Sequence, residues 1–104
     1  MTNQLRTSKF NVLPINNITR NASLASAATL TIPPKACGLF LQVESGNINY
    51  TLDGTTPTTG ATGVGFKRTS TDGVVRIDLF PGATVRVIEQ AASAVIQYQF
   101  FTSF

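Results

Sequence analysis

The feature that constrains this chain most is a series of short β-branched and aromatic runs that begins at Leu24 and continues to the C-terminus. Gly, Pro, Asp and Thr clusters separate the runs, and within the run 39–44 apolar and polar residues alternate with a period of two. Many short strands at regular spacing are typical of sandwiches and jelly rolls. The sequence therefore predicts an all-β fold, an antiparallel β-sandwich or jelly roll of about seven to eight strands. Strands are expected at 30–32, 39–44, 48–52, 75–79, 84–89 and 94–104, and one more is expected to begin at Val64.

Two of the breaks predict hairpins. Ser45-Gly46-Asn47 is expected to turn the strand 39–44 into the strand 48–52, as a hairpin with one apolar face. Asp72-Gly73 is expected to join the strand that begins at Val64 to the next one, because Asp-Gly readily takes the positive φ values of a tight turn.

The first 23 residues differ from the rest, since neither a period of two nor one of 3.6 persists in them. Pro14 interrupts the segment and its Asn residues favour turns. It nevertheless carries several large apolar residues, which a freely disordered tail rarely displays. We expect an extended N-terminal arm, residues 1–23, that lies against its own domain or a neighbour's, followed by one β-sandwich domain, residues 24–104.

Charge is scarce in this chain. Charged residues make up 12% of the sequence and the formal net charge is +3, too small a surplus for an electrostatic nucleic-acid binder. The low charge has two explanations: partners cover part of the surface, or Thr, Ser, Asn and Gln hydrate it instead. No stretch approaches the ~18 apolar residues of a membrane span, and the N-terminus lacks the apolar core of a secretory signal. We expect no membrane and no specific nucleic acid among the partners, and synthesis in the cytosol.

The residues needed for common catalytic schemes are missing. Histidine is absent, which removes the commonest general base and metal ligand, and Cys37 is the only cysteine. The carboxylates show no pairing in the sequence, and Asp53 and Asp72 each precede Gly, where Asp is favoured by its bonds to nearby backbone amides. The sequence therefore predicts that the chain is not an enzyme, with no catalytic residue, no cofactor and no metal. The carboxylates are Glu44, Asp53, Asp72, Asp78 and Glu89.

Calcium is the metal that the residues come nearest to suiting. Asp53 is followed by Gly54-Thr55-Thr56, whose carbonyls and hydroxyls are hard oxygen ligands. One carboxylate is too few for us to predict a calcium site there.

Phe40, Phe80 and Phe101 each fall on the face of their strand that is opposite to its other apolar residues. Three outward Phe side chains on one small domain predict a contact patch, whereas the alternative is that the arm or a loop covers them. Together with four apolar residues of the arm, they are our candidate interface residues. These are Phe10, Val12, Leu13, Ile15, Phe40, Phe80 and Phe101.

The most distinctive string is Ile48-Asn49-Tyr50-Thr51-Leu52-Asp53-Gly54-Thr55-Thr56-Pro57-Thr58, a strand that runs into an Asp-Gly-Thr-x-Pro-Thr turn. It resembles small β-sandwich virion structural proteins of tailed bacteriophages, of the capsid cement or decoration type, over residues 30–101. A similar turn occurs in Ig-like accessory domains of chitobiase-type glycosidases, to which the similarity is weaker. The motif needs no ligand, because Gly54 permits the turn, Pro57 stiffens the loop and the Thr hydroxyls bond the backbone.

The resemblance implies a role in a virion. We expect a non-enzymatic phage structural protein, a capsid cement or decoration protein, that stabilises the shell through oligomeric contacts. Its partners would be the major capsid protein and copies of itself, and its location the virion after synthesis in the host cytoplasm. The alternative is a tail-associated carbohydrate- or receptor-binding module.

Overall fold

The strands of the computed structural model, which describes residues 12–103, form two antiparallel sheets that face each other. The predicted all-β antiparallel sandwich is confirmed. The five-stranded sheet has the order β1 (Val12–Pro14), β9 (Val95–Ser103), β4 (Gly38–Ser45) and β7 (Val74–Asp78), and β2 (Thr19–Asn21) also pairs with β9. The four-stranded sheet has the order β3 (Ala28–Thr29), β8 (Arg86–Glu89), β5 (Asn47–Thr51) and β6 (Phe66–Thr69).

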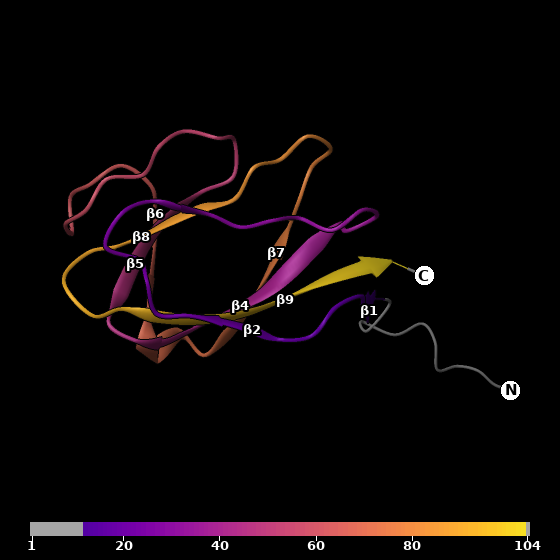
Figure 1. The fold of residues 1–104 in the computed structure, drawn as a ribbon, viewed down its shortest axis with the longest axis horizontal. Coiled ribbons are helices and arrows are strands. Elements are labelled where there is room, and N and C mark those ends of the chain that lie inside the picture. The colour runs from indigo at the N-terminus through magenta and orange to yellow at the C-terminus, as the bar shows by residue number, and fades with distance from the viewer. Residues whose placement is uncertain (1–11, 104) are drawn as a thin grey trace, which may run out of the picture.

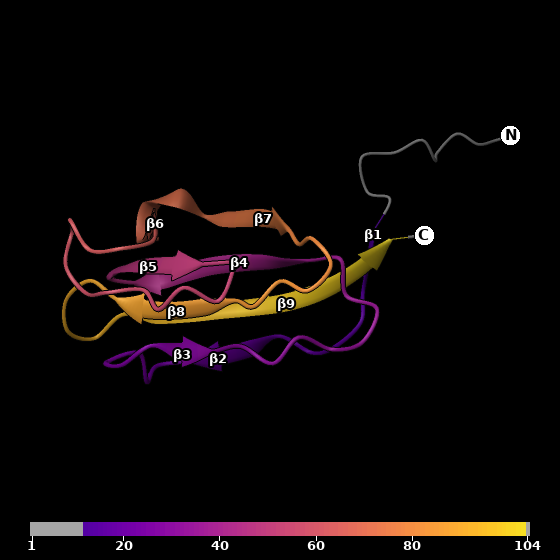
Figure 2. The same cartoon turned by 90° about the horizontal axis from the view of Figure 1, so that it is seen from above.

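At both predicted hairpins the chain instead crosses from one sheet to the other, which corrects the two predictions. β4 and β5 lie in different sheets, and so do β6 and β7. Gly46 and Gly73 take the expected positive φ values of 73° and 70°. At both places, however, the next strand joins the opposite sheet and does not pair with the strand before it. Burial explains the difference. A hairpin would leave the apolar faces of both strands in one layer, whereas the crossing places Ile48 on β5 in the sheet that covers Leu41 on β4. Figure 2 shows the sheets in matching order, with β2 and β3 at one edge and β6 and β7 at the other.

The core lies between the sheets and is made of alternate residues of the longer strands. Leu39 and Phe100, directly opposite each other on β4 and β9, are fully buried, and Val87 on β8 meets them from the other sheet. The strand expected at 30–32 begins two residues earlier, as β3. Leu30 comes directly after β3, and its N–H donates a hydrogen bond to the Val85 carbonyl at 2.9 Å. The buried core residues are Leu24, Leu30, Leu39, Leu41, Val43, Ile48, Tyr50, Ile77, Val85, Val87, Ala94, Ile96 and Phe100.

The described part of the arm completes one edge of the five-stranded sheet. β1 and β2 both pair with β9, so this part of the arm lies against its own domain (Figure 1). Between them the N–H of Ile15 donates to the carbonyl of Phe100 at 3.1 Å. On β2 the guanidinium of Arg20 binds the carboxylate of Glu44 on β4, across β9.

The loop that follows β5 covers the outer face of the four-stranded sheet. Asn49 is fully buried beneath it and donates from its amide to the carbonyls of Thr58 and Gly60, at 2.7 and 2.9 Å. The amide of Gln90 in turn donates to the Asn49 side-chain oxygen at 3.0 Å. The distinctive Asp-Gly-Thr-x-Pro-Thr turn therefore packs on its own sheet, and its polar groups have structural partners.

None of the helical segments within residues 12–103 is long and apolar enough to span a membrane.

Candidate binding surfaces

An apolar cleft of about 560 Å³ opens beside β6, at the edge of the four-stranded sheet. Val64, Phe66 and Phe80 line it and are 51%, 63% and 50% exposed. Phe66 lies directly opposite the buried Tyr50, with ring centroids 5.7 Å apart. Its side chain therefore points to the same side of the sheet as the core, but β6 is the edge strand and leaves the ring half open. The lining of this apolar cleft is Thr51, Leu52, Asp53, Thr55, Val64, Gly65, Phe66 and Phe80.

The polar groups of the apolar cleft gather around Asp53. Its carboxylate accepts a hydrogen bond from the backbone N–H of Thr55 at 3.0 Å, and hydrogen bonding from Thr55 lowers the pKa of Asp53 below its usual value. Within residues 12–103, no group of three or more carboxylate, cysteine or histidine side chains is placed to hold a metal ion. Asp53 thus provides the cleft with one negative charge on an apolar wall.

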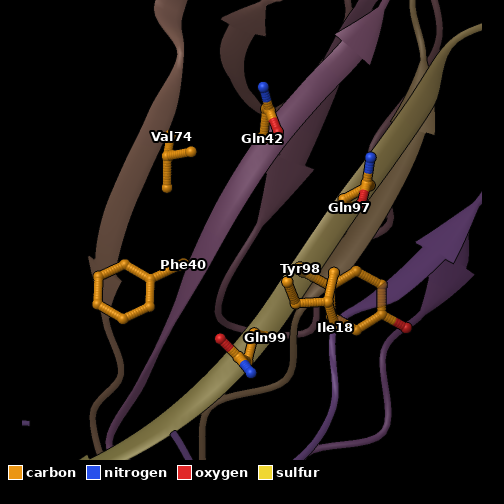
Figure 3. Close-up of a pocket in the computed structure, with 7 residues that line it drawn as sticks. All are labelled: Ile18, Phe40, Gln42, Val74, Gln97, Tyr98 and Gln99. Atoms are coloured by element: carbon orange, nitrogen blue, oxygen red, sulfur yellow. The ribbon is translucent and has the colours of Figure 1, made fainter. Parts of the chain in front are cut away.

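A second hollow, of about 240 Å³, lies on the outer face of the five-stranded sheet. Figure 3 shows Phe40 and Gln42 from β4 and Gln97 and Gln99 from β9 around it, with Val74 from β7 on one side. The strand register aligns them, because Gln42 is directly opposite Gln97 and Phe40 is directly opposite Gln99. We call this hollow the glutamine groove; its lining is Ile18, Phe40, Gln42, Val74, Gln97, Tyr98 and Gln99.

Hydrogen bonds hold two of the three amides of the glutamine groove. Gln97 donates to the Glu44 carboxylate at 3.0 Å, and Gln99 donates to the backbone carbonyl of Asn16 at 2.8 Å. Glu44 is neutralised by Arg20, whose hydrogen bond lowers the pKa of Glu44 below its usual value. The groove therefore presents two oriented amides, and the carboxylate of Glu44 beside them is paired with Arg20.

The candidate interface residues divide between the two surfaces, the arm and the interior. Phe80 lies in the apolar cleft and Phe40 in the glutamine groove. On β1, Leu13 is exposed and Val12 is half-buried, and Ile15 just after it packs against the core. Phe10 is outside the described residues.

Phe101 differs from the expectation of an outward contact residue, because it is fully buried. It lies on the outer face of the five-stranded sheet opposite Gly38, where a Cβ would come within 2.2 Å of its ring. The Phe40 ring lies 4.9 Å from the Phe101 ring, and the Arg76 guanidinium lies 5.0 Å from the ring centroid. These neighbours cover Phe101, so its side chain is not exposed on the outer face.

Sequence reasoning missed Ile18, Val74 and Phe66 as surface residues. The alternation of Gln97 and Gln99 with apolar residues predicted the polar side of β9, which is half of the glutamine groove. Ile18 and Val74 join it only because β2 and β7 flank β9 and β4 in the sheet. No local pattern carries that information.

This chain resembles a known protein in its structure, but no match is found from its sequence. No family model and no curated protein matches the chain. A solved structure of dTDP-4-dehydrorhamnose 3,5-epimerase (rfbC) from Bacillus anthracis str. Ames, with TDP and PPi bound, is similar, with a TM-score of 0.59 and 16% sequence identity. The similarity covers 96% of this chain and 59% of the epimerase chain, so this chain spans less than two thirds of that protein. At this identity the likeness shows a shared fold.

This likeness corrects the expectation that the chain is not an enzyme. That expectation came from the absence of histidine and from the scattered carboxylates. The epimerase is an enzyme whose structure shares this fold, so the fold does not exclude catalysis. A shared fold does not transfer the epimerase's own activity to this chain.

Proposed function

We propose that this protein is a structural component of a bacteriophage virion, of the capsid cement or decoration type, which assembles with copies of itself and with the major capsid protein. The apolar cleft beside β6 is the observation that carries the proposal. The resemblance of residues 48–58 to small β-sandwich virion proteins supplies the context.

The apolar cleft has the composition of a contact site. A single exposed Phe needs no explanation, but Val64, Phe66 and Phe80 line the same cleft and are each at least half exposed. The volume of about 560 Å³ is within the usual range of ligand pockets, roughly 300–1,000 Å³. Large apolar side chains that fill such pockets contribute much of the binding energy of protein interfaces.

A second copy of the chain is the neighbour that we infer for this cleft. Residues 1–11 precede β1 and carry Leu5 and Phe10 together with the basic Arg6 and Lys9. These types match an apolar cleft that bears the carboxylate of Asp53. A segment of eleven residues can span at most about 40 Å, which is enough to reach an adjoining subunit.

The test is binding to capsids that lack the protein, measured by co-sedimentation. The wild-type protein is expected to bind. Phe66→Ser combined with Phe80→Ser should weaken self-association, measured by analytical ultracentrifugation, by about 10-fold or more, since each removes an apolar anchor of the contact between copies. Deletion of residues 1–11 should weaken self-association while β1 to β9 stay folded. Ile18→Ser, which lies in the glutamine groove, is the matched control and should bind as the wild type does.

Mass spectrometry of purified virions provides the second test. The proposal fails if virions of the phage that encodes the chain do not contain it, or if the double variant self-associates as strongly as the wild type. Recovery from tails and not from heads would replace the cement role by the alternative, a tail-associated carbohydrate- or receptor-binding module.

A further inference from the structure

We propose that the glutamine groove on the five-stranded sheet is a binding site for a neutral sugar. The site is separate from the apolar cleft, because it lies on the outer face of the other sheet. The inference therefore does not depend on the place of the protein in a virion.

The strand register places the polar and apolar groups of the groove in two rows. In one row Val74, Gln42 and Gln97 lie directly opposite one another on β7, β4 and β9. In the next row Phe40 lies directly opposite Gln99. An aromatic ring and an aliphatic side chain thus flank three amide groups within one shallow hollow (Figure 3).

Two of the amides are already oriented before any ligand arrives. The Gln97 nitrogen donates to Glu44 and the Gln99 nitrogen donates to the Asn16 carbonyl. Each amide has two N–H donors and one carbonyl with two lone pairs, so each keeps one donor and one acceptor for a ligand. Holding the amides in place lowers the entropy that binding would otherwise cost.

The chemistry of these groups selects the ligand. Amides both donate and accept hydrogen bonds, as the hydroxyl groups of a sugar do, and they carry no charge. The nearby charges are paired: Arg20 with Glu44 and Arg76 with Asp78. An anionic ligand would find no unpaired cation here, whereas the apolar faces of Phe40 and Val74 suit the C–H face of a sugar ring.

The size of the groove sets the length of the ligand. Its volume of about 240 Å³ is below the roughly 300 Å³ at which pockets for drug-sized ligands begin. One sugar ring, free or at the end of a glycan, therefore fits, and a groove this small and open predicts affinity in the millimolar range.

The experiment is an NMR titration of the full chain with glucose, galactose, mannose and N-acetylglucosamine in turn. At least one of them should shift the side-chain amide signals of Gln42, Gln97 and Gln99 in a saturable manner. Gln99→Ala and Gln42→Ala should each lower the affinity by about 10-fold, the equivalent of one hydrogen bond, while the rest of the spectrum stays dispersed.

Two controls separate this site from the apolar cleft and from weak general binding. Phe66→Ser should leave the sugar affinity unchanged, so failure of the sugar site and failure of the virion proposal are distinguishable. The proposal is overturned if none of the four sugars shifts these amides, if glycerol or glucuronic acid shifts them equally well, or if the two Gln variants bind as tightly as the wild type.

Discussion

Arg20 on β2 and Glu44 on β4 are joined by two hydrogen bonds, of 2.8 and 3.0 Å, although β9 lies between their strands. The pair bridges β9 and fastens the three-residue strand β2 to the longest strand pair of the sheet. Gln97 on β9 donates to the same carboxylate. The edge of the sheet and the floor of the glutamine groove therefore share one polar cluster.

Glu44→Gln should loosen β2 without unfolding the sandwich. The substitution removes the charge that Arg20 binds, and β2 otherwise has only a short pairing with β9. Hydrogen exchange should become faster at the backbone amides of β2 and remain unchanged in β5 and β8. Asp78→Asn, which breaks the exposed pair with Arg76, is the matched control and should leave β2 protected.

The Arg20–Glu44 pair also predicts a pH dependence. The hydrogen bond from Arg20, followed by that from Gln97, holds the pKa of Glu44 below 4.5 in the folded state. A lowered folded-state pKa contributes stability that is present above pH 4.5 and is lost as the pH falls through the folded-state pKa. Urea unfolding at a series of pH values from 6 downward should show a loss below about pH 4.5 that is smaller in Glu44→Gln. Identical pH profiles for the two proteins would contradict this role of Glu44.

Asn49→Ala should destabilise the domain by about 2–4 kcal/mol. The substitution removes the buried Asn49 amide, which binds the carbonyls of Thr58 and Gly60 and accepts from the Gln90 amide. Urea unfolding gives the free energy. Asn47→Ala, at an exposed position on the same strand, should change it by less than about 0.5 kcal/mol; equal effects at both positions would show that the buried amide has no special role.

Gly38→Ala should cost about 1–3 kcal/mol through overpacking. A Cβ at residue 38 would meet the Phe101 ring at 2.2 Å and the Ile77 carbonyl at 2.7 Å. Shortening the ring to Leu should relieve the first contact, so Gly38→Ala combined with Phe101→Leu should cost less than the sum of the single variants. Strict additivity in this double-mutant cycle would mean that the Gly38–Phe101 contact does not limit the packing.

The sequence predicted the fold class because strand periodicity is a local signal. The run 39–44 and the last strand each alternate in the printed sequence, and both form strands close to the expected bounds. The pairing of strands is not local. A positive φ at Gly46 or Gly73 allows a hairpin and equally allows a connection to the opposite sheet. The choice depends on how the apolar faces of all the strands cover one another in two layers.

The same limit applies to the binding surfaces. The alternation along the strands placed Phe40, Phe80 and Phe101 on outer faces, but it did not show which of them other residues would bury. Phe101 is buried because a glycine, Gly38, lies opposite it in the register. Phe80 and Phe66 meet in one cleft although they belong to segments in which no spacing links them. Residues that depend on register or on distant loops cannot be recognised from a local pattern.

A reconstruction of the intact phage particle tests the central proposal most directly. It is predicted to show the nine-stranded sandwich bound to the capsid shell, with the apolar cleft at Phe66 and Phe80 filled by apolar side chains of a neighbouring subunit. A particle whose shell lacks this sandwich, or one in which the cleft faces solvent in every copy, would contradict it.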